Sequence, residues 1–242
     1  MTDKLQELKQ EFQETATYCQ RFCFAARARE FQVEAVERLE KLKVKVVDLK
    51  AKMIAAQEED YANQLLSMEE MINALVYELK MWVAFKDDDP HAAWTNIVEA
   101  QSSARSAMQA HDIARHLEPY IERLYALEKL LFPPQMFMSA GVVIRRSTCS
   151  ICGMEYGSCE HLVGKPYMGQ ICARVIEEAD IREVSIVPEP ANKHCRILSI
   201  SDENGTRDLM TWRLIPERLS DQNPEDIVRR YFLNNSNEGN AG

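Results

Sequence analysis

The chain reads C-S-I-C-G-M-E-Y-G-S-C-E-H from Cys149 to His161. A Cys-x-x-Cys pair is followed, within one short loop, by a Cys-x-His pair, and thiolate and imidazole are the ligands that tetrahedral Zn²⁺ prefers. Two glycines lie between the pairs, and glycine permits the positive φ angles at which a backbone turns sharply around an ion. The pattern therefore predicts a metal site with four ligands, Cys149, Cys152, Cys159 and His161.

Four protein ligands fill the coordination sphere of zinc and leave no position for water or substrate, so the predicted ion is structural. It would contribute folding free energy to a small domain. The alternatives are reduced, buried thiols beside a surface histidine, or a set of disulfides. Cys172, Cys195 and His194 are further candidate ligands, although the strand-like surroundings of the two cysteines favour core positions. Cys19 and Cys23, four residues apart on a predicted helix, are expected in the helical core.

Composition limits the class of protein. The 242 residues suit one large domain or two small ones. No apolar run reaches the roughly 20 residues of a membrane span, and the first residues lack signal-peptide character. Seven cysteines together with a metal-like cluster indicate a reducing cytoplasm. The net charge of −9 argues against binding nucleic acid without sequence preference.

Glycine and proline divide the chain into two parts. All eight glycines lie at or after Gly141, and proline is absent before Pro90, which indicates a helical first half and a second half of loops and strands. The join is expected at Phe132-Pro133-Pro134, because consecutive prolines cannot continue a helix. The predicted class is α+β, with a helical, coiled-coil-like domain at 1–132, a zinc-binding β-rich domain with a C-terminal helix at 133–233, and a disordered tail at 234–242.

The helical half carries apolar residues at alternating steps of three and four, the spacing of a coiled-coil seam. The runs extend over residues 5–26, 39–56 and 61–82. We interpret the phase slip between Ala26 and Leu39 as a distortion within one arm of about 55 residues, and the slip near Asp60 as the turn of a long-helix hairpin. Asp89 as N-cap and Pro90 at the first helical position should begin the next helix. Whether the helices pair within one chain or between chains stays open.

The second half reads as short strands separated by turns. Strands are predicted at Val142–Ile144, Ile171–Ile176, Glu183–Val187 and Cys195–Ile200 because these runs are short and rich in β-branched residues. Asn204-Gly205 is a turn signal. Asn223 and Pro224 should begin a final helix that ends near Leu233.

Two segments of this half resemble tailed-phage prohead (head-maturation) proteases. M-S-A-G-V-V at 138–143 resembles their Ser-x-Gly segment, and E-V-S-I-V-P-E-P-A-N at 183–192 is similar to the Glu-Val-Ser-Leu-Val…Pro-Ala-Asn strand that follows it. The resemblance covers about residues 136–197, with the metal loop as an insertion. It implies that Ser139 is a catalytic nucleophile, which would need a histidine as base. His194 is the histidine of this half that the metal site leaves for that role.

Three functions are compatible with these patterns. The first is a non-enzymatic, zinc-stabilised interaction or assembly protein that contacts a protein partner, or itself, through the helical region. The second is a serine peptidase of the prohead type, active or degenerate, of phage or prophage origin. The third is a nucleic-acid-associated zinc protein, which would need a basic surface built from the candidates Arg145, Arg146, Lys165 and Arg174.

Overall fold

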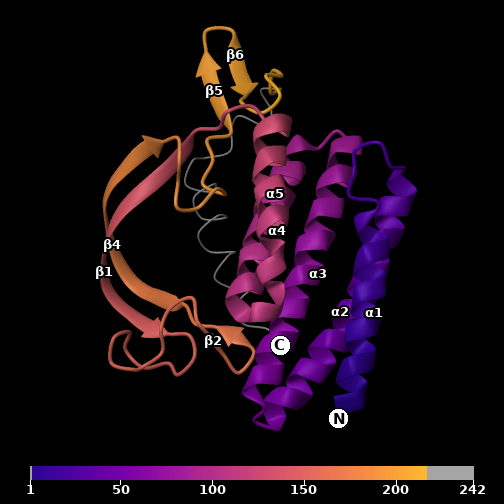
Figure 1. Ribbon diagram of the computed structural model, residues 1–242. Coiled ribbons are helices and arrows are strands. Elements are labelled where there is room, and N and C mark those ends of the chain that lie inside the picture. Colours follow the sequence, from indigo (N-terminus) through magenta and orange to yellow (C-terminus); the bar gives the residue numbers. More distant parts are fainter. Residues whose placement is uncertain (1, 217–242) are drawn as a thin grey trace. The chain divides into compact units, whose positions relative to one another are not determined.

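The computed structural model describes residues 2–216 and confirms the α+β class, with helices followed by small antiparallel sheets (Figure 1). The predicted final helix at 223–233 and the predicted tail at 234–242 lie outside the described residues. The helices are α1 (Thr2–Gln20), α2 (Arg29–Ala55), α3 (Glu59–Lys86), α4 (Pro90–Ala110), the 3-10 turn η1 (Asp112–Leu117) and α5 (Glu118–Leu131). The strands are β1 (Phe137–Cys149), β2 (Pro166–Tyr167), β3 (Gln170–Ile171), β4 (Arg174–Val187), β5 (Ser199–Asp202) and β6 (Gly205–Asp208).

The apolar stripes of the first half meet in one core. Leu39 and Val46 of α2 and Leu65, Ile72 and Leu79 of α3 are all fully buried in it. Cys19 and Cys23 lie in the same core, as predicted. The heptad positions thus pack against one another within a single chain, while supercoiling of these helices stays a prediction. Among residues 2–216 no helix has a stretch long and apolar enough to cross a membrane.

The helix ends agree with the sequence at two places and differ at a third. The turn expected near Asp60 lies between α2 and α3, and the Asp89 carboxylate accepts a hydrogen bond of 2.9 Å from the backbone N–H of Ala92 at the start of α4. The single arm of about 55 residues was wrong, because the chain leaves the helix between α1 and α2. The buried amide of Gln32 stabilises that break, since its Nε2 donates to the carbonyl oxygens of Phe22 and Phe24 at 2.9 and 3.0 Å.

A long antiparallel ribbon of β1 and β4 follows the helices (Figure 1). Phe137 pairs with Val187 at one end and Cys149 pairs with Arg174 at the other. The register shifts at three places between Gly141 and Ser147. The strand predicted at 142–144 is therefore only the middle of β1. The two strands predicted at 171–176 and 183–187 were wrong as separate elements, because β4 is continuous from 174 to 187.

The chain divides into two compact units, Met1–Arg196 and a unit that begins at Ile197. The boundary predicted at 132–133 falls between α5 and β1, inside the first unit. In the second unit β5 and β6 form a hairpin whose turn lies at the predicted Asn204-Gly205, with φ of +118° at Gly205. The strand predicted at Cys195–Ile200 was wrong in its start, since β5 begins at Ser199.

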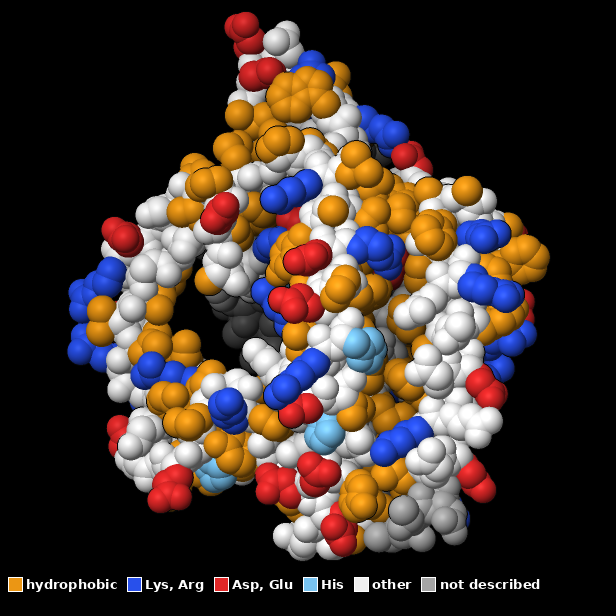
Figure 2. All heavy atoms as spheres, in the orientation of Figure 1, with side chains coloured by type: hydrophobic (Ala, Val, Ile, Leu, Met, Phe, Trp, Pro, Cys, Tyr) orange, Lys and Arg blue, Asp and Glu red, His pale blue; other side chains and the backbone are white. Residues whose placement is uncertain are grey.

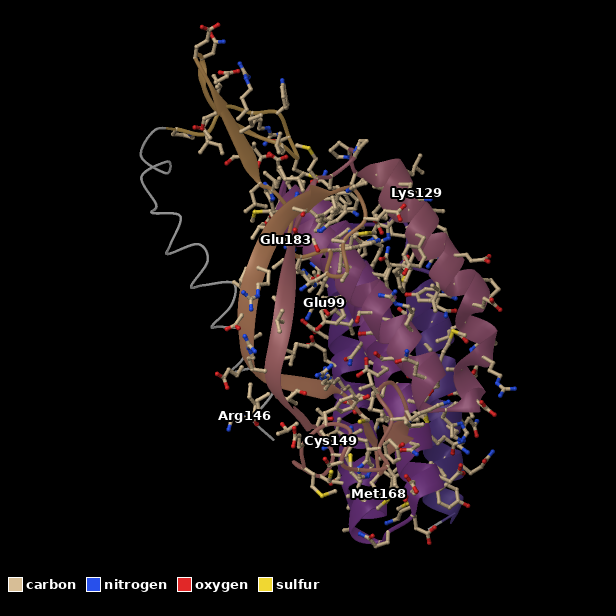
Figure 3. All side chains as sticks on the ribbon, turned by 90° about the vertical axis from the view of Figure 1, so that its left-hand side faces the viewer. Glu99, Lys129, Arg146, Cys149, Met168 and Glu183 are labelled. Atoms are coloured by element: carbon tan, nitrogen blue, oxygen red, sulfur yellow. The ribbon has the colours of Figure 1, made fainter. Side chains whose placement is uncertain are left out.

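The ribbon is fixed to the helices near both of its ends. At one end the indole of Trp94 packs against the rings of Phe132 and Phe137, with ring centroids 5.2 and 6.0 Å apart, and its N–H donates to the carbonyl of Lys193 at 3.1 Å. At the other end the N–H of Gly169, in the β2–β3 turn, donates to the side chain of Asn63 in α3 at 2.8 Å. Figure 3 shows Glu183 on the ribbon and Met168 close to the helices.

Candidate metal centre

The structure brings the four predicted ligands together at one end of the ribbon. Cys149 is the last residue of β1, Cys152 lies in the turn that follows, and Cys159 and His161 lie in the loop before β2. Their ligand atoms all lie within 4.8 Å of one another. This cluster could hold a metal ion, and its three thiols and one imidazole form a set that suits zinc. Cys149 is labelled in Figure 3, at the end of the ribbon that carries the metal loop.

The backbone of the loop turns back on itself after β1. The N–H of Gly153 donates to the carbonyl of Cys149 at 2.8 Å, and the N–H of Cys149 donates to the carbonyl of Met154 at 2.9 Å. Gly153 has a φ of +70° and Gly157 has a φ of +97°, values in the left-handed region that glycine adopts without strain. The glycines between the ligand pairs thus have the role that the sequence predicted for them.

The environment of Cys149 favours its thiolate. Burial opposes the charged form, but hydrogen bonds from the backbone N–H groups of Cys152 and Ile151 and from the thiol of Cys172 outweigh it and lower the pKa of Cys149 to about 6. The thiolate is the form of cysteine that binds a metal ion. The turn therefore favours the form of this side chain that could coordinate a metal ion.

His161 provides separate support for a metal. Its Nδ1 atom is buried and, among the described residues, has no hydrogen-bond partner. The ring is held edge-on against Tyr167, with centroids 4.7 Å apart. A buried polar atom without a partner is costly and rare in folded proteins. An ion bound at this nitrogen would remove that cost.

The further candidate ligands separate into near and remote residues. The buried Cys172 lies beside the cluster, with its Sγ 3.7 Å from the Sγ of Cys149. Cys195 lies at the opposite end of the ribbon, where its carbonyl accepts from the N–H of Met138. His194 Nε2 lies 3.0 Å from the carboxylate of Glu99 in α4. The strand position expected for Cys172 and Cys195 was wrong, since both residues lie outside the strands.

Ser139 lies on β1 opposite Ser185 of β4. Within residues 2–216 no hydrogen bond joins it to a histidine. His91 contacts Arg196, His111 lies near Asp60, His116 contacts the Ile113 carbonyl, His161 lies in the metal cluster and His194 contacts Glu99. The role of Ser139 as a nucleophile stays a prediction.

Three of the four basic residues proposed for nucleic acid have side-chain partners. Arg145 forms an ion pair with Asp180 at 2.6 Å and Arg146 forms one with Glu177 at 2.8 Å. Arg174 donates to the hydroxyl of Ser147 at 2.8 Å. Acidic groups thus neutralise two of the four candidates, which weakens the case for an anion-binding surface around the metal loop.

Sequence reasoning missed the residues that fix the metal loop to the helices. A Cβ atom at Gly169 would lie 3.2 Å from the side chain of Ile54 and 3.3 Å from that of Lys50, so the loop approaches α2 closely at this point. Met168 also donates its N–H to Glu59 at 3.3 Å. In the sequence, only Gly169 between the short strands indicated a close approach of the backbone to another element. It did not indicate which helix the backbone would approach.

Comparisons of this chain with protein-family models, with curated proteins and with solved structures found no match.

Proposed function

We propose that the protein is a non-enzymatic interaction or assembly protein in which a structural zinc ion holds the end of the β1–β4 ribbon in place. The observation that carries this proposal is the set of four ligands within 4.8 Å, three thiols and one imidazole, at the tip of the ribbon. Such a set would fill the sphere of zinc and leave no open position for catalysis.

The ion would stabilise the attachment of the ribbon as well as the loop itself. The ligand loop leads directly into β2 and β3, whose turn contacts Asn63 and Glu59 of α3. Folding of a metal loop is coupled to metal binding, because the ligands converge only in the folded state. Binding of zinc would therefore favour the contact between this turn and the helices.

The ribbon offers an apolar face for protein contact. Paired residues on neighbouring strands share a face, and the successive pairs Met138–Ile186, Ala140–Val184 and Val142–Ile181 place apolar side chains on one side. The large side chains among them are between 43% and 68% exposed. Figure 2 shows hydrophobic side chains at the surface on the side of the molecule where the ribbon lies. Exposed apolar side chains gathered in this way indicate an interaction site.

We place the contact on the ribbon because the heptad residues of the helices are already buried within the chain. A second copy of the chain is the occupant we propose. The apolar pairs lie on one exposed side of the ribbon, so two copies related by a two-fold axis can pack this same face against each other and bury it. The seven cysteines, all free thiols, suit a reducing compartment.

Elemental analysis of protein purified without added metal tests the zinc ion. About one zinc per chain is expected from a single four-ligand site. Cys149→Ser combined with Cys152→Ser should lose it, whereas the matched control Cys195→Ser, at the remote end of the ribbon, should retain it. Folded wild-type protein without bound metal would contradict the proposal.

Sedimentation velocity tests the assembly. Ile181→Lys combined with Val184→Lys should shift the wild-type assembly toward the monomer, because both charges would be buried in the contact. The control Val143→Lys places a charge beside Asp180 on the other face of the ribbon and should leave the assembly unchanged. A wild-type protein that stays monomeric at high concentration would contradict the proposed self-association.

A second candidate is the serine peptidase that the prohead-protease resemblance implies. One observation favours it. The two resembling segments, 40 residues apart in the chain, pair directly, so that Ser139 faces Ser185 and Gly141 faces Glu183. Labelling with a fluorophosphonate probe that is abolished by Ser139→Ala, but not by Ser185→Ala, would support this function. Absence of labelling would count against it.

A further inference from the structure

The metal centre has one thiol more than a four-coordinate ion needs. Cys172 is 1% exposed, and its Sγ lies 3.7 Å from the Sγ of Cys149. Two thiolates bound to the same tetrahedral zinc, with Zn–S bonds of about 2.3 Å, lie about 3.8 Å apart. Cys149 and Cys172 therefore already have the separation of two ligands of one ion.

The backbone holds Cys172 firmly in this position. Its N–H donates to the carbonyl of Lys165 at 2.8 Å, and its carbonyl accepts from the N–H of Gly164 at 2.8 Å. These bonds link the segment after β3 to the segment before β2, directly beyond the last ligand, His161. The thiol is thus fixed next to the cluster by the same short hairpin that contacts the helices.

We propose that Cys172 is an alternative ligand of this four-coordinate centre. It replaces His161 on the metal when the imidazole is displaced or when the bound metal favours sulfur over nitrogen. The inference rests on the proposed metal site. Its chemical basis is the preference of soft ions for thiolate and of borderline ions such as zinc for either thiolate or imidazole. The centre would then alternate between three thiolates with one imidazole and four thiolates.

The test uses four full-length proteins loaded with Co²⁺: wild type, His161→Ala, Cys172→Ser and the double variant. Metal content gives the occupancy, and the near-ultraviolet sulfur-to-cobalt absorption reports the number of bound thiolates. Wild type and Cys172→Ser should each bind one ion with three thiolates. His161→Ala should still bind one ion, with charge-transfer absorption higher by about one third because a fourth thiolate joins the sphere. The double variant should bind at least about tenfold more weakly than either single variant.

Two results would overturn the role of Cys172. One is loss of metal from His161→Ala as complete as from the double variant, and the other is a His161→Ala spectrum with only three thiolates. Absence of metal from the wild type would instead overturn the centre itself, so the two failures are distinct.

A measurement on the wild-type chain tests the same exchange of ligands without any substitution, so it does not depend on whether the variants fold. Cadmium is softer than zinc, and the chemical shift of ¹¹³Cd distinguishes four sulfur ligands from three sulfurs and one nitrogen. The wild-type cadmium protein should give the four-sulfur signal. A signal from three sulfurs and one nitrogen would contradict the exchange.

Discussion

One carboxylate in the helical core forms an ion pair with an arginine of α5. Glu78 is fully buried, and its Oε2 accepts from the guanidinium of Arg123 at 2.6 Å. Removing one partner of a buried ion pair leaves an uncompensated charge. We therefore expect Arg123→Met to lower the free energy of unfolding by about 3 kcal/mol, as measured by urea denaturation.

Arg115→Met is the matched control. Its partner Asp112 lies 2.8 Å away, but both side chains are about three quarters exposed, and exposed pairs contribute little. Equal destabilisation by the two variants would show that the burial of Glu78 has no special cost.

A surface aspartate gives a prediction about pH. The guanidinium of Arg29, which donates to both carboxylate oxygens of Asp87 at 2.7 and 2.8 Å, lowers the pKa of that carboxyl group. A carboxyl whose folded pKa is lowered stabilises the protein above its ordinary titration range, and this stabilisation is lost as pH falls through the folded pKa. Arg29→Gln should raise the pKa of Asp87 toward its ordinary value. Side-chain carboxyl shifts followed by NMR against pH measure this change, and an unchanged titration would contradict the pairing.

At the scale of elements, the sequence predicted what depends on local chemistry. Asp89 and Pro90 begin α4, and the turn before α3 lies where the stripe slips. The break between α1 and α2 had no glycine or proline to signal it. It is stabilised by Gln32, which lies ten and eight residues from the two carbonyls to which it donates, and periodicity does not reveal such a contact.

Gln32→Leu tests this account of the break. Two carbonyl oxygens in partly buried hydrogen bonds would lose their donor, so we expect a loss of about 1–3 kcal/mol in the free energy of unfolding. Thermal and urea denaturation measure it. Gln10→Leu, on the exposed surface of α1, is the control and should change stability little. A neutral Gln32→Leu would mean that solvent or other groups satisfy these carbonyls.

The long strands were underestimated for a related reason. Residues 177–183 of β4 are mostly charged, and such residues seldom indicate a strand. They are stabilised across the ribbon by pairs such as Arg145–Asp180 and Arg146–Glu177. Pairing between segments about 35 residues apart determines this element, whereas the four metal ligands fall within 13 residues and could be recognised together.

Within the first compact unit, metal removal should have a local effect. If the proposed zinc ion is bound, chelation should increase amide hydrogen exchange in residues 162–173, because the loop and the Gly169–Asn63 contact would depend on that ion. Peptides from α3 should keep their protection, since their core is independent of the loop. Mass spectrometry of both regions in one sample provides the comparison. Equal protection of residues 162–173 with and without chelator would contradict a structural ion.

The register shifts between β1 and β4 have a consequence for colloidal behaviour. An even, flat ribbon with apolar side chains and open edges would be a template for endless stacking into amyloid-like fibres. Three irregularities between Gly141 and Ser147 increase the local twist, so a neighbouring edge can match only a short stretch before the strands diverge. Growth by repeated addition is thereby disfavoured, and the proposed self-association would end at small, closed particles.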